Sequence, residues 1–470
     1  MKLFKNFNKY NDRIALISEI TGDITYSQID TYTKKIKDYI EKRSLVLIIS
    51  QNTVGSIVSY ISCIRNNFVV ILVDIKTNNN KIKNLIKLYK PSYLIAPETE
   101  IDNFNFQEIN KKKIYDYSIC KIDSNNKITS NKNLSLLLPT SGSMGSPKLV
   151  KLSNKNLYFN CKSIVKYLKI KQSCRTITTM PSSYSYMLSI INSYLEVGAS
   201  IVVEKKSILE RDFWHTYKKN KISSFSGVPY IFETLIKLGF KKILSKSLKV
   251  ITQAGGKLDS KSQKLISMIC KKKKIKFFIM YGQTEASPRI SYLGPKFSLL
   301  MIGSIGKPIP GVKMWIENKF KKKILKPNQI GNLCIKGKNV FMGYSYSYND
   351  LKKGDQNKGY LNTGDLAYFN KKKFFFLTGR KNRIIKIFGN RINLSELENM
   401  LSQKKFETVC IFKEDKIFIL FEKKYKEDKL KKQVAEITSL NLSAFRFKLL
   451  KKFPRTLNKK IDFKKILQKI

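Results

Sequence analysis

The stretch PTSGSMGSPK at positions 139–148 follows the apolar run LSLLL at 134–138 and is the starting point for the fold. The run is typical of a buried strand. Two glycines, four Ser or Thr hydroxyls and a terminal lysine can together surround a phosphate chain. A Walker A loop is excluded, because Pro147 and Leu149 stand where that motif needs Gly and Ser or Thr. The stretch therefore predicts a phosphate-binding loop after a strand, with a Ser/Gly surface loop as the alternative.

Length and composition indicate a globular chain of two or three domains, since 470 residues exceed what one hydrophobic core supports. Seven scattered cysteines without a C-x-x-C pair suggest neither a disulfide framework nor a zinc site, and so a reducing compartment. The N-terminus lacks an apolar segment of signal-peptide length, and the longest apolar run, 68–73, is far shorter than a membrane span. We expect a cytoplasmic protein without a transmembrane segment.

The formal net charge of +56 raises the question of a nucleic-acid or anionic-membrane partner. The lysines are spread along the whole chain and accompany many Asn, Ile, Tyr and Phe, residues with AT-rich codons. A bias in base composition accounts for this pattern without a selected basic patch, so we predict no specific nucleic-acid partner. A basic nucleic-acid-binding protein stays the alternative from another functional class, and salt-sensitive binding to RNA or DNA would favour it.

Short apolar runs alternate with helical segments over most of the chain, which predicts an α/β fold. The expected strands are 45–49, 68–73, 93–96, 134–138, 176–180, 200–204, 223–227, 249–253 and 276–280, and the expected helices include 27–40, 81–89 and 156–168, the last capped by Ser153. The polar segment 102–133 reads as a connection or an irregular edge. After Ser304 the chain becomes β-rich, and from Gly379 it resembles a small α+β domain. We expect a large N-terminal α/β domain of several β-sheets with flanking helices at 1–379, and a small domain at 380–470.

Six further motifs follow the loop in order, most of them after predicted strands. They are GVP at 227–229, QAGGKL at 253–258, YGQTE at 281–285, GYLNTGD at 359–365, GRKNRIIKIFGNRINLSELE at 379–398 and PRTLNKKID at 454–462. In this order the set resembles the adenylate-forming (AMP-binding) superfamily, which includes acyl-CoA synthetases and stand-alone adenylation enzymes. The resemblance runs from about residue 134 to the C-terminus.

The resemblance implies a ligase that uses ATP and Mg²⁺. A carboxylate attacks the α-phosphate of ATP, pyrophosphate leaves, and a thiol captures the acyl-adenylate. The residues implied to hold the β- and γ-phosphates are Thr140, Ser141, Gly142, Ser143, Gly145 and Lys148. Glu285 is the implied Mg²⁺ ligand, and Thr284 the implied donor to the α-phosphate.

The same resemblance assigns the nucleoside. Tyr281 offers a stacking face for adenine, and Gly282, Gly255 and Gly256 belong to the same nucleotide-binding loops. Asp365 is expected to accept hydrogen bonds from the ribose hydroxyls, with Arg380 beside the same sugar.

The closing motif implies that Lys460 is the catalytic lysine, which places positive charge where negative charge develops. In the family the small C-terminal domain is mobile and rotates between the two half-reactions; here the hinge would be near Asn382, and the loop around Gly389 would approach the thiol. The chain departs from the family at Lys459, which replaces Gly, at Asn382, and at Met144 and Leu149 in the phosphate loop. A non-catalytic relative therefore stays open as an alternative.

The segment 180–200 matches the part of the family that shapes the acyl pocket, with Tyr184 at the position nearest to the family's pocket residues. It contains no Asp to pair with an α-ammonium group, so we expect a fatty, aryl or hydroxy acid rather than an α-amino acid. The acceptor is coenzyme A or the phosphopantetheine of an acyl carrier protein acting in trans. The single histidine, His215, lies away from every motif and is expected to be structural or exposed.

Overall fold

The structure is a computed structural model that describes residues 2–101, 104, 111–122, 129–139, 148–240, 244–387, 390–438 and 440–470. The chain forms two compact units, Met1–Lys313 with Lys336–Leu361, and Met314–Ile335 with Asn362–Ile470. The domains predicted at 1–379 and 380–470, drawn where the sequence changes character after Gly379, and the hinge near Asn382 stay predictions.

One sheet of the first unit has the order β19-β9-β8-β4-β3-β5-β7-β6. Its centre is parallel, because β3 pairs in parallel with β4 and β5, and β4 with β8. All six residues of β3 are buried, as expected for a strand covered on both faces. The segment predicted as an irregular edge contributes β6 and β7 at one edge. The strands are β3 Leu45–Ser50, β4 Val69–Asp74, β5 Tyr93–Pro97, β6 Lys112–Ile114, β7 Tyr117–Lys121, β8 Leu134–Pro139, β9 Leu149–Ser153 and β19 Gly343–Ser345.

The second set of strands in this unit follows the order β16-β15-β14-β13-β12-β10-β11-β1-β2. The run from β14 to β1 is parallel throughout, whereas β15, β16 and β2 are antiparallel to their neighbours. The strands are β1 Ile14–Ser18, β2 Gly22–Thr25, β10 Arg175–Ile177, β11 Ser200–Val202, β12 Ser224–Gly227, β13 Val250–Gln253, β14 Lys276–Gly282, β15 Arg289–Leu293 and β16 Ser304–Pro308. The predicted α/β class and its parallel strands are confirmed.

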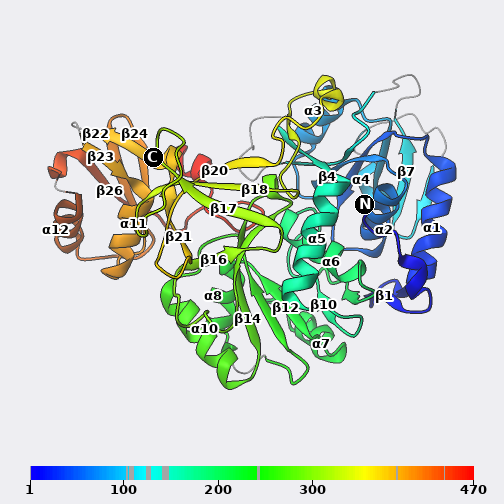
Figure 1. Cartoon of the computed structure of the whole chain (residues 1–470), viewed down its shortest axis with the longest axis horizontal. Coiled ribbons are helices and arrows are strands. Elements are labelled where there is room, and N and C mark those ends of the chain that lie inside the picture. Colours follow the sequence, from blue (N-terminus) through cyan, green and yellow to red (C-terminus); the bar gives the residue numbers. More distant parts are fainter. Residues whose placement is uncertain are drawn as a thin grey trace. The chain divides into compact units, whose positions relative to one another are not determined.

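Helices flank these strands, and Figure 1 shows α8 and α10 beside β12 and β14. The predicted cap of α5 is confirmed: the Ser153 hydroxyl accepts a hydrogen bond from the Asn156 amide at 3.0 Å. The helices of the first unit are α1 Tyr26–Tyr39, α2 Val54–Arg65, α3 Asn79–Tyr89, α4 Glu98–Ile101, α5 Asn154–Leu168, α6 Ser185–Leu195, α7 Arg211–Lys219, α8 Pro229–Lys237 and α10 Ser260–Lys272, with short 3₁₀ helices η1 Phe7–Tyr10, η3 Thr284–Ala286 and η4 Tyr348–Lys352.

The second unit contains a small α+β core, as the sequence predicts. Leu397 and Leu401 of α11 pack with Ile417 and Ile419 of β25 and with Leu430 of α12. Its strands are β17 Val312–Glu317, β18 Gly331–Gly337, β20 Tyr360–Phe369 and β21 Phe375–Arg380, which lie in that order, the hairpin β22 Ile384–Ile387 and β23 Asn390–Asn393, and the sheet of β24 Thr408–Lys413, β25 Lys416–Phe421 and β26 Phe445–Leu449. Its helices are α11 Leu394–Gln403, α12 Glu427–Thr438, α13 Phe463–Leu467, η5 Lys381–Arg383 and η6 Leu442–Ala444.

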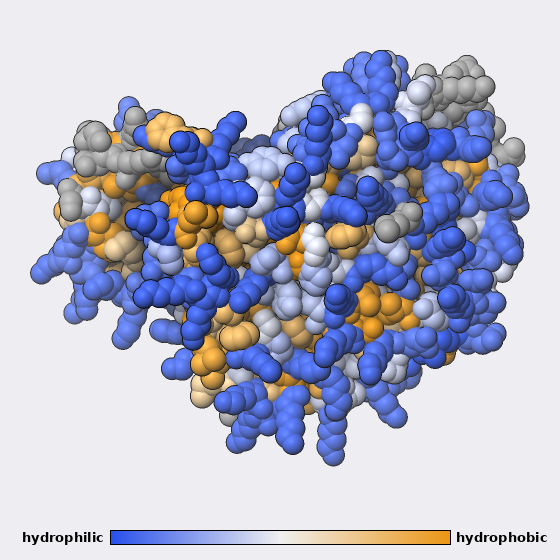
Figure 2. Space-filling model, viewed as in Figure 1, coloured by the Kyte–Doolittle hydropathy of each residue, from blue (hydrophilic) through white to orange (hydrophobic). Residues whose placement is uncertain are grey.

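The face of the molecule drawn in Figure 2 is strongly hydrophilic. In Figure 2 hydrophilic residues are distributed over the whole of the visible face, with small apolar areas between them. This distribution agrees with the scatter of lysines along the sequence. None of the described helices combines the length and the apolar character that crossing a membrane requires.

Candidate active site

Three of the predicted motifs meet at one edge of the second set of strands. The parallel strands β12, β13 and β14 are in register, with Gly227 opposite Gln253 and Gln253 opposite Ile279. Their carboxyl ends therefore lie side by side, and each continues into a motif: GVP, QAGGKL and YGQTE. Ligands of open α/β sheets bind beyond the carboxyl ends of the strands. This edge is the candidate site.

The QAGG loop lies against the predicted acyl-pocket segment. Gly255 has φ +84°, and a Cβ there would lie 2.6 Å from the Tyr184 hydroxyl. Gln253 is fully buried and donates a hydrogen bond to the Gly256 carbonyl at 2.9 Å, which fixes the loop. Gly255 therefore has a steric reason to be glycine, and the loop is held close to Tyr184.

Gly282 allows β14 and β15 to approach closely. It lies opposite Arg289, and a Cβ there would lie 1.8 Å from the Pro288 carbonyl oxygen. The short helix η3, which carries Thr284 and Glu285, forms the connection between these two closely spaced strands. Thr284 lies 3.2 Å, hydroxyl to hydroxyl, from Ser185 in α6. The motif YGQTE and the acyl-pocket segment are thus in contact.

Glu285 and Lys148 both contact Tyr344, a residue that the sequence analysis did not single out. The Tyr344 hydroxyl donates to Glu285 Oε1 at 2.9 Å, and Lys148 Nζ lies 3.5 Å from the centroid of the Tyr344 ring. Burial, and then the Glu285 carboxylate, raise the pKa of Tyr344, so its phenol stays protonated and can donate. Tyr344 reaches this position because β19 pairs with β9, which follows Lys148, with Tyr344 opposite Val150.

The Glu285 carboxylate is suited to act as an oxygen ligand of Mg²⁺. It is half-buried, and no Lys or Arg nitrogen of the described residues lies within 4.0 Å of it. Mg²⁺ in phosphate-transfer sites needs only one or two carboxylates, because phosphates and water supply the other oxygens.

The predicted ribose pair, Asp365 and Arg380, is brought together in the second unit. The two residues are opposite each other in the antiparallel pair β20 and β21. Arg380 Nε donates to Asp365 Oδ1 at 3.0 Å, and the side chain of Asp365 is only 7% exposed whereas that of Arg380 is 62% exposed. The arginine orients an acceptor-only carboxylate, the kind of group that can accept hydrogen bonds from a diol.

Lys460 lies in a tight turn of the closing motif. The Thr456 amide donates to the Lys460 carbonyl at 2.7 Å, and the Lys460 amide donates to the Thr456 hydroxyl at 3.2 Å. Lys459 has φ +59°, in the left-handed region. This conformation gives a physical reason for the glycine that the family has there, since only glycine adopts it without strain.

Replacing Lys459 by glycine should therefore stabilise the turn by about 0.5 to 1 kcal/mol, the relief of the left-handed strain minus the extra entropy of unfolded glycine. The expected result is a higher urea midpoint for the transition that unfolds the closing segment. Hydrogen exchange of the Lys460 amide monitors this transition. Lys459→Ala is the matched control, because it removes the charge but keeps the Cβ; an equal gain from both variants would contradict the strain.

Several predicted residues stay untested. Thr140, Ser141, Gly142, Ser143 and Gly145, with Met144, and Gly389 lie outside the described residues, and of Asn382 only the backbone is described, in η5. Tyr281 is half-buried at the end of β14, where its predicted adenine contact stays a prediction. His215 is an exposed residue of α7, as expected.

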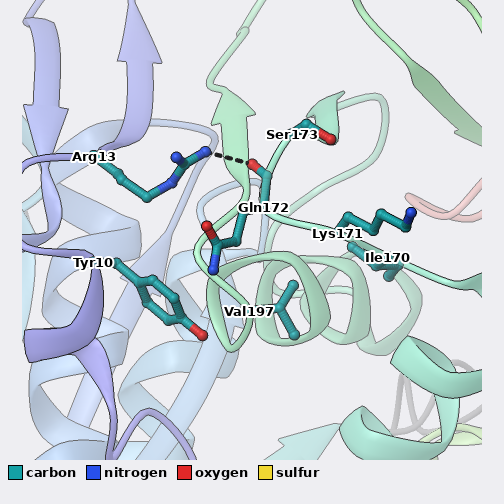
Figure 3. Close-up of a pocket in the computed structure, with 7 residues that line it drawn as sticks. All are labelled: Tyr10, Arg13, Ile170, Lys171, Gln172, Ser173 and Val197. Atoms are coloured by element: carbon teal, nitrogen blue, oxygen red, sulfur yellow. Dashed lines mark hydrogen bonds between the residues drawn. The ribbon is translucent and has the colours of Figure 1, made fainter.

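A separate pocket of about 540 Å³ lies in the first unit, between the start of β1 and the loop before β10 (Figure 3). Arg13 reaches across it and donates to the carbonyls of Gln172 at 2.8 Å and Gly198 at 3.0 Å. None of the predicted site residues lines this pocket. The arginine is used to join two segments of the chain, and the candidate site lies elsewhere.

Comparison with known proteins gives the family. The chain matches the AMP-binding enzyme family over residues 3–345. It is 25% identical over 402 residues to a 2-succinylbenzoate–CoA ligase of Oceanobacillus iheyensis, covering 83% of this chain and 81% of that one. The corresponding ligase of Bacillus subtilis is 26% identical over 265 residues, 56% of this chain and 52% of that one, so the chain spans about half the length of this relative.

The fold is also that of solved structures. The o-succinylbenzoate CoA synthetase of Bacillus subtilis, in complex with its acyl-adenylate intermediate, superposes with a TM-score of 0.77 at 21% identity, covering 96% of this chain and 94% of that one. Klebsiella oxytoca NpsA, in complex with 3-hydroxyanthranilyl-AMSN, gives a TM-score of 0.78 at 17% identity, covering 100% of this chain and 99% of that one. With a family match over residues 3–345 and a site built at the ends of β12, β13 and β14, the chain belongs to the AMP-binding enzyme family.

Proposed function

We propose that this protein is an AMP-forming carboxylic acid:thiol ligase that activates a small carboxylic acid with ATP and transfers the acyl group to coenzyme A. The observation that carries the proposal is the contact of Glu285 and Lys148 with Tyr344 beside the acyl-pocket segment. Tyr344 holds one carboxylate and one cation together, and in the sequence Lys148 directly follows the segment 140–147, which is rich in glycine and hydroxyls, as a polyphosphate and its metal require. The curated relatives named 2-succinylbenzoate–CoA ligases support an aryl acid as substrate and coenzyme A as acceptor.

The chemistry proceeds in two balanced steps. A carboxylate oxygen of the acid forms a bond to the α-phosphorus of ATP as the bond to the β-phosphate oxygen breaks, which gives acyl-adenylate and pyrophosphate. The thiol sulfur then forms a bond to the acyl carbon, the thiol proton is lost to solvent, and AMP leaves. The first step adds negative charge near the α-phosphate, where fixed cations stabilise the transition state most.

Each group of this chain has one task in that scheme. Lys148, held over the Tyr344 ring, faces the departing phosphates, and Thr284 donates to the α-phosphate. Glu285 would hold Mg²⁺, and the ion would supply positive charge to the phosphate oxygens. Asp365 accepts from the ribose hydroxyls in an orientation that Arg380 fixes. Lys460 supplies positive charge for the adenylation step.

The test is release of pyrophosphate from ATP across a panel of fatty, aryl, hydroxy and amino acids, followed by analysis of thioester formation with coenzyme A and then with an acyl carrier protein. We expect acid-dependent release that is strongest with aryl acids, and thioester formation with coenzyme A. Absence of acid-dependent release with every class would contradict the proposal and favour a non-catalytic relative. Thioester on the carrier protein alone would contradict coenzyme A as acceptor while leaving the adenylation step in place.

The ribose assignment gives a direct prediction. Asp365→Asn should raise the dissociation constant for ATP by about 10- to 100-fold, since a charged acceptor of buried hydrogen bonds contributes about 1.5 to 3 kcal/mol. Calorimetric titration with ATP and with 2′,3′-dideoxy-ATP measures it: the variant should lose the preference for the hydroxylated nucleotide. If both nucleotides weaken equally, Asp365 acts through folding rather than through the sugar. Arg380→Lys, which keeps the charge but not the guanidinium geometry, should give a smaller loss.

A further inference from the structure

A buried arginine lies beside the candidate acyl pocket. Arg289 is the first residue of β15, lies opposite Gly282 of β14, and is only 2% exposed. Arginine is rarely buried so completely without an anionic partner. Its guanidinium lies against Tyr186 of α6, the helix whose Ser185 contacts Thr284, so its charge lies close to the candidate site.

Aromatic side chains surround this charge. The Arg289 Cζ lies 4.1 Å from the centroid of the Tyr186 ring, Tyr167 forms a hydrogen bond with the guanidinium, and the ring of Tyr184 meets that of Tyr186 at 6.3 Å. Burial raises the pKa of Tyr184 to about 12 and also raises that of Tyr186, although Arg289 lowers both. The phenols are therefore neutral near pH 7 and do not supply the missing negative charge.

No carboxylate of the described residues lies within 4.0 Å of the guanidinium, whereas other arginines such as Arg380 and Arg383 have carboxylate partners. The Arg289 Nε is buried and has no hydrogen-bond partner among the described residues. An unpaired buried donor and an uncompensated charge are both costly. We therefore expect the Arg289 guanidinium to pair with an anion that the described residues do not supply.

The main chain holds Arg289 in place. Its carbonyl accepts hydrogen bonds from Asn160 at 3.0 Å and from Asn339 at 2.8 Å, and both asparagines are buried. The guanidinium therefore projects from a fixed backbone toward the Tyr184–Tyr186 segment, which contacts Thr284 through Ser185. A rigid backbone limits the reorganisation that binding an anion would require.

We infer that Arg289 binds a second carboxylate of the acid substrate, so that the preferred substrates are dicarboxylic acids. The inference rests on the proposed function, because it takes the Tyr184 segment to face the acyl group. A guanidinium recognises a carboxylate through two parallel hydrogen bonds, and the free Nε is one of the donors such a pair uses. The substrate carboxylate that attacks ATP lies near Thr284. The second substrate carboxylate supplies the anionic partner that the described residues do not give to Arg289.

Matched pairs of acids test this. The first pair is 2-succinylbenzoate and 3-benzoylpropionate, which differ only in the ring carboxylate, and the second is glutarate and butyrate. Wild-type enzyme should show a kcat/KM about 100-fold higher for the dicarboxylic member of at least one pair. Arg289→Met should remove that preference and leave the monocarboxylic acid within a few-fold of wild type, and Arg289→Lys should retain part of it.

Controls separate recognition from folding. Tyr186→Phe keeps the ring next to Arg289 but removes the hydroxyl bonded to Thr252, and it should change both members of a pair by the same factor. If Arg289→Met does not fold, Arg289→Lys carries the comparison. Equal rates of wild type with both members of each pair, or equal losses in the variants, would overturn the inference alone. A wild type without pyrophosphate release for any acid overturns the proposed function as well.

Discussion

Replacing Lys460 by alanine should slow formation of the acyl-adenylate by about 10² to 10³, the effect of removing a preorganised charge from a developing oxyanion. Capture of a supplied acyl-adenylate by coenzyme A should stay within a few-fold, because that step breaks the bond to AMP without forming charge on the α-phosphate. The two half-reactions are measured separately, by pyrophosphate release and by thioester formation from synthetic adenylate. Equal loss in both would show that Lys460 is not the lysine of the adenylation step.

Lys459 is the neighbouring rival for this role, and the turn distinguishes the two residues. Lys459 is exposed and has the left-handed backbone, while Lys460 is half-buried and tied to Thr456 through both its amide and its carbonyl. A catalytic cation needs a fixed position. Lys459→Ala should therefore keep adenylation within about threefold of wild type, well below the effect expected of a removed catalytic charge. If that variant were the one to lose adenylation, the assignment of the closing motif would shift by one residue.

Those parts of the candidate site that directly follow strands could be predicted from the sequence. The loops after β12, β13 and β14 begin where apolar runs end in glycine or polar residues, and a parallel sheet brings such ends together. The pair of Asp365 and Arg380 was also predicted, although it depends on a hairpin register that places the two residues opposite each other.

Tyr344 and Arg289 could not be predicted in the same way. Tyr344 reaches Glu285 only because β19, a strand of three residues, pairs with β9 nearly two hundred residues earlier in the chain. No local pattern encodes such a contact; the motif GYS after the apolar VFM is the one signal present. Arg289 gives no signal in the sequence either, because arginine is normally a surface residue, and only the structure shows it buried in β15 opposite Gly282.

The second large effect is expected at Glu285, where replacement by glutamine should lower kcat/KM for adenylation by about 100-fold or more, since a hard cation loses its anionic oxygen ligand. Glutamine keeps an oxygen that can accept the Tyr344 hydroxyl, so the variant removes the charge and preserves the hydrogen bond. Adenylation should become dependent on a higher Mg²⁺ concentration, and calorimetry should show that Mg²⁺ no longer strengthens the binding of ATP.

Tyr344→Phe is the matched variant for this experiment, because it removes the hydrogen bond to Glu285 and keeps the ring under Lys148. Partners that orient a metal ligand typically contribute 10- to 100-fold to affinity or activity, so about tenfold is expected here. Glu285→Gln should therefore lower adenylation activity more than Tyr344→Phe does. It should also raise the required Mg²⁺ concentration more. An unchanged Mg²⁺ requirement in Glu285→Gln would mean that the carboxylate orients Tyr344 and Lys148 instead of holding the metal. Tyr344→Phe would then lose at least as much adenylation activity as Glu285→Gln.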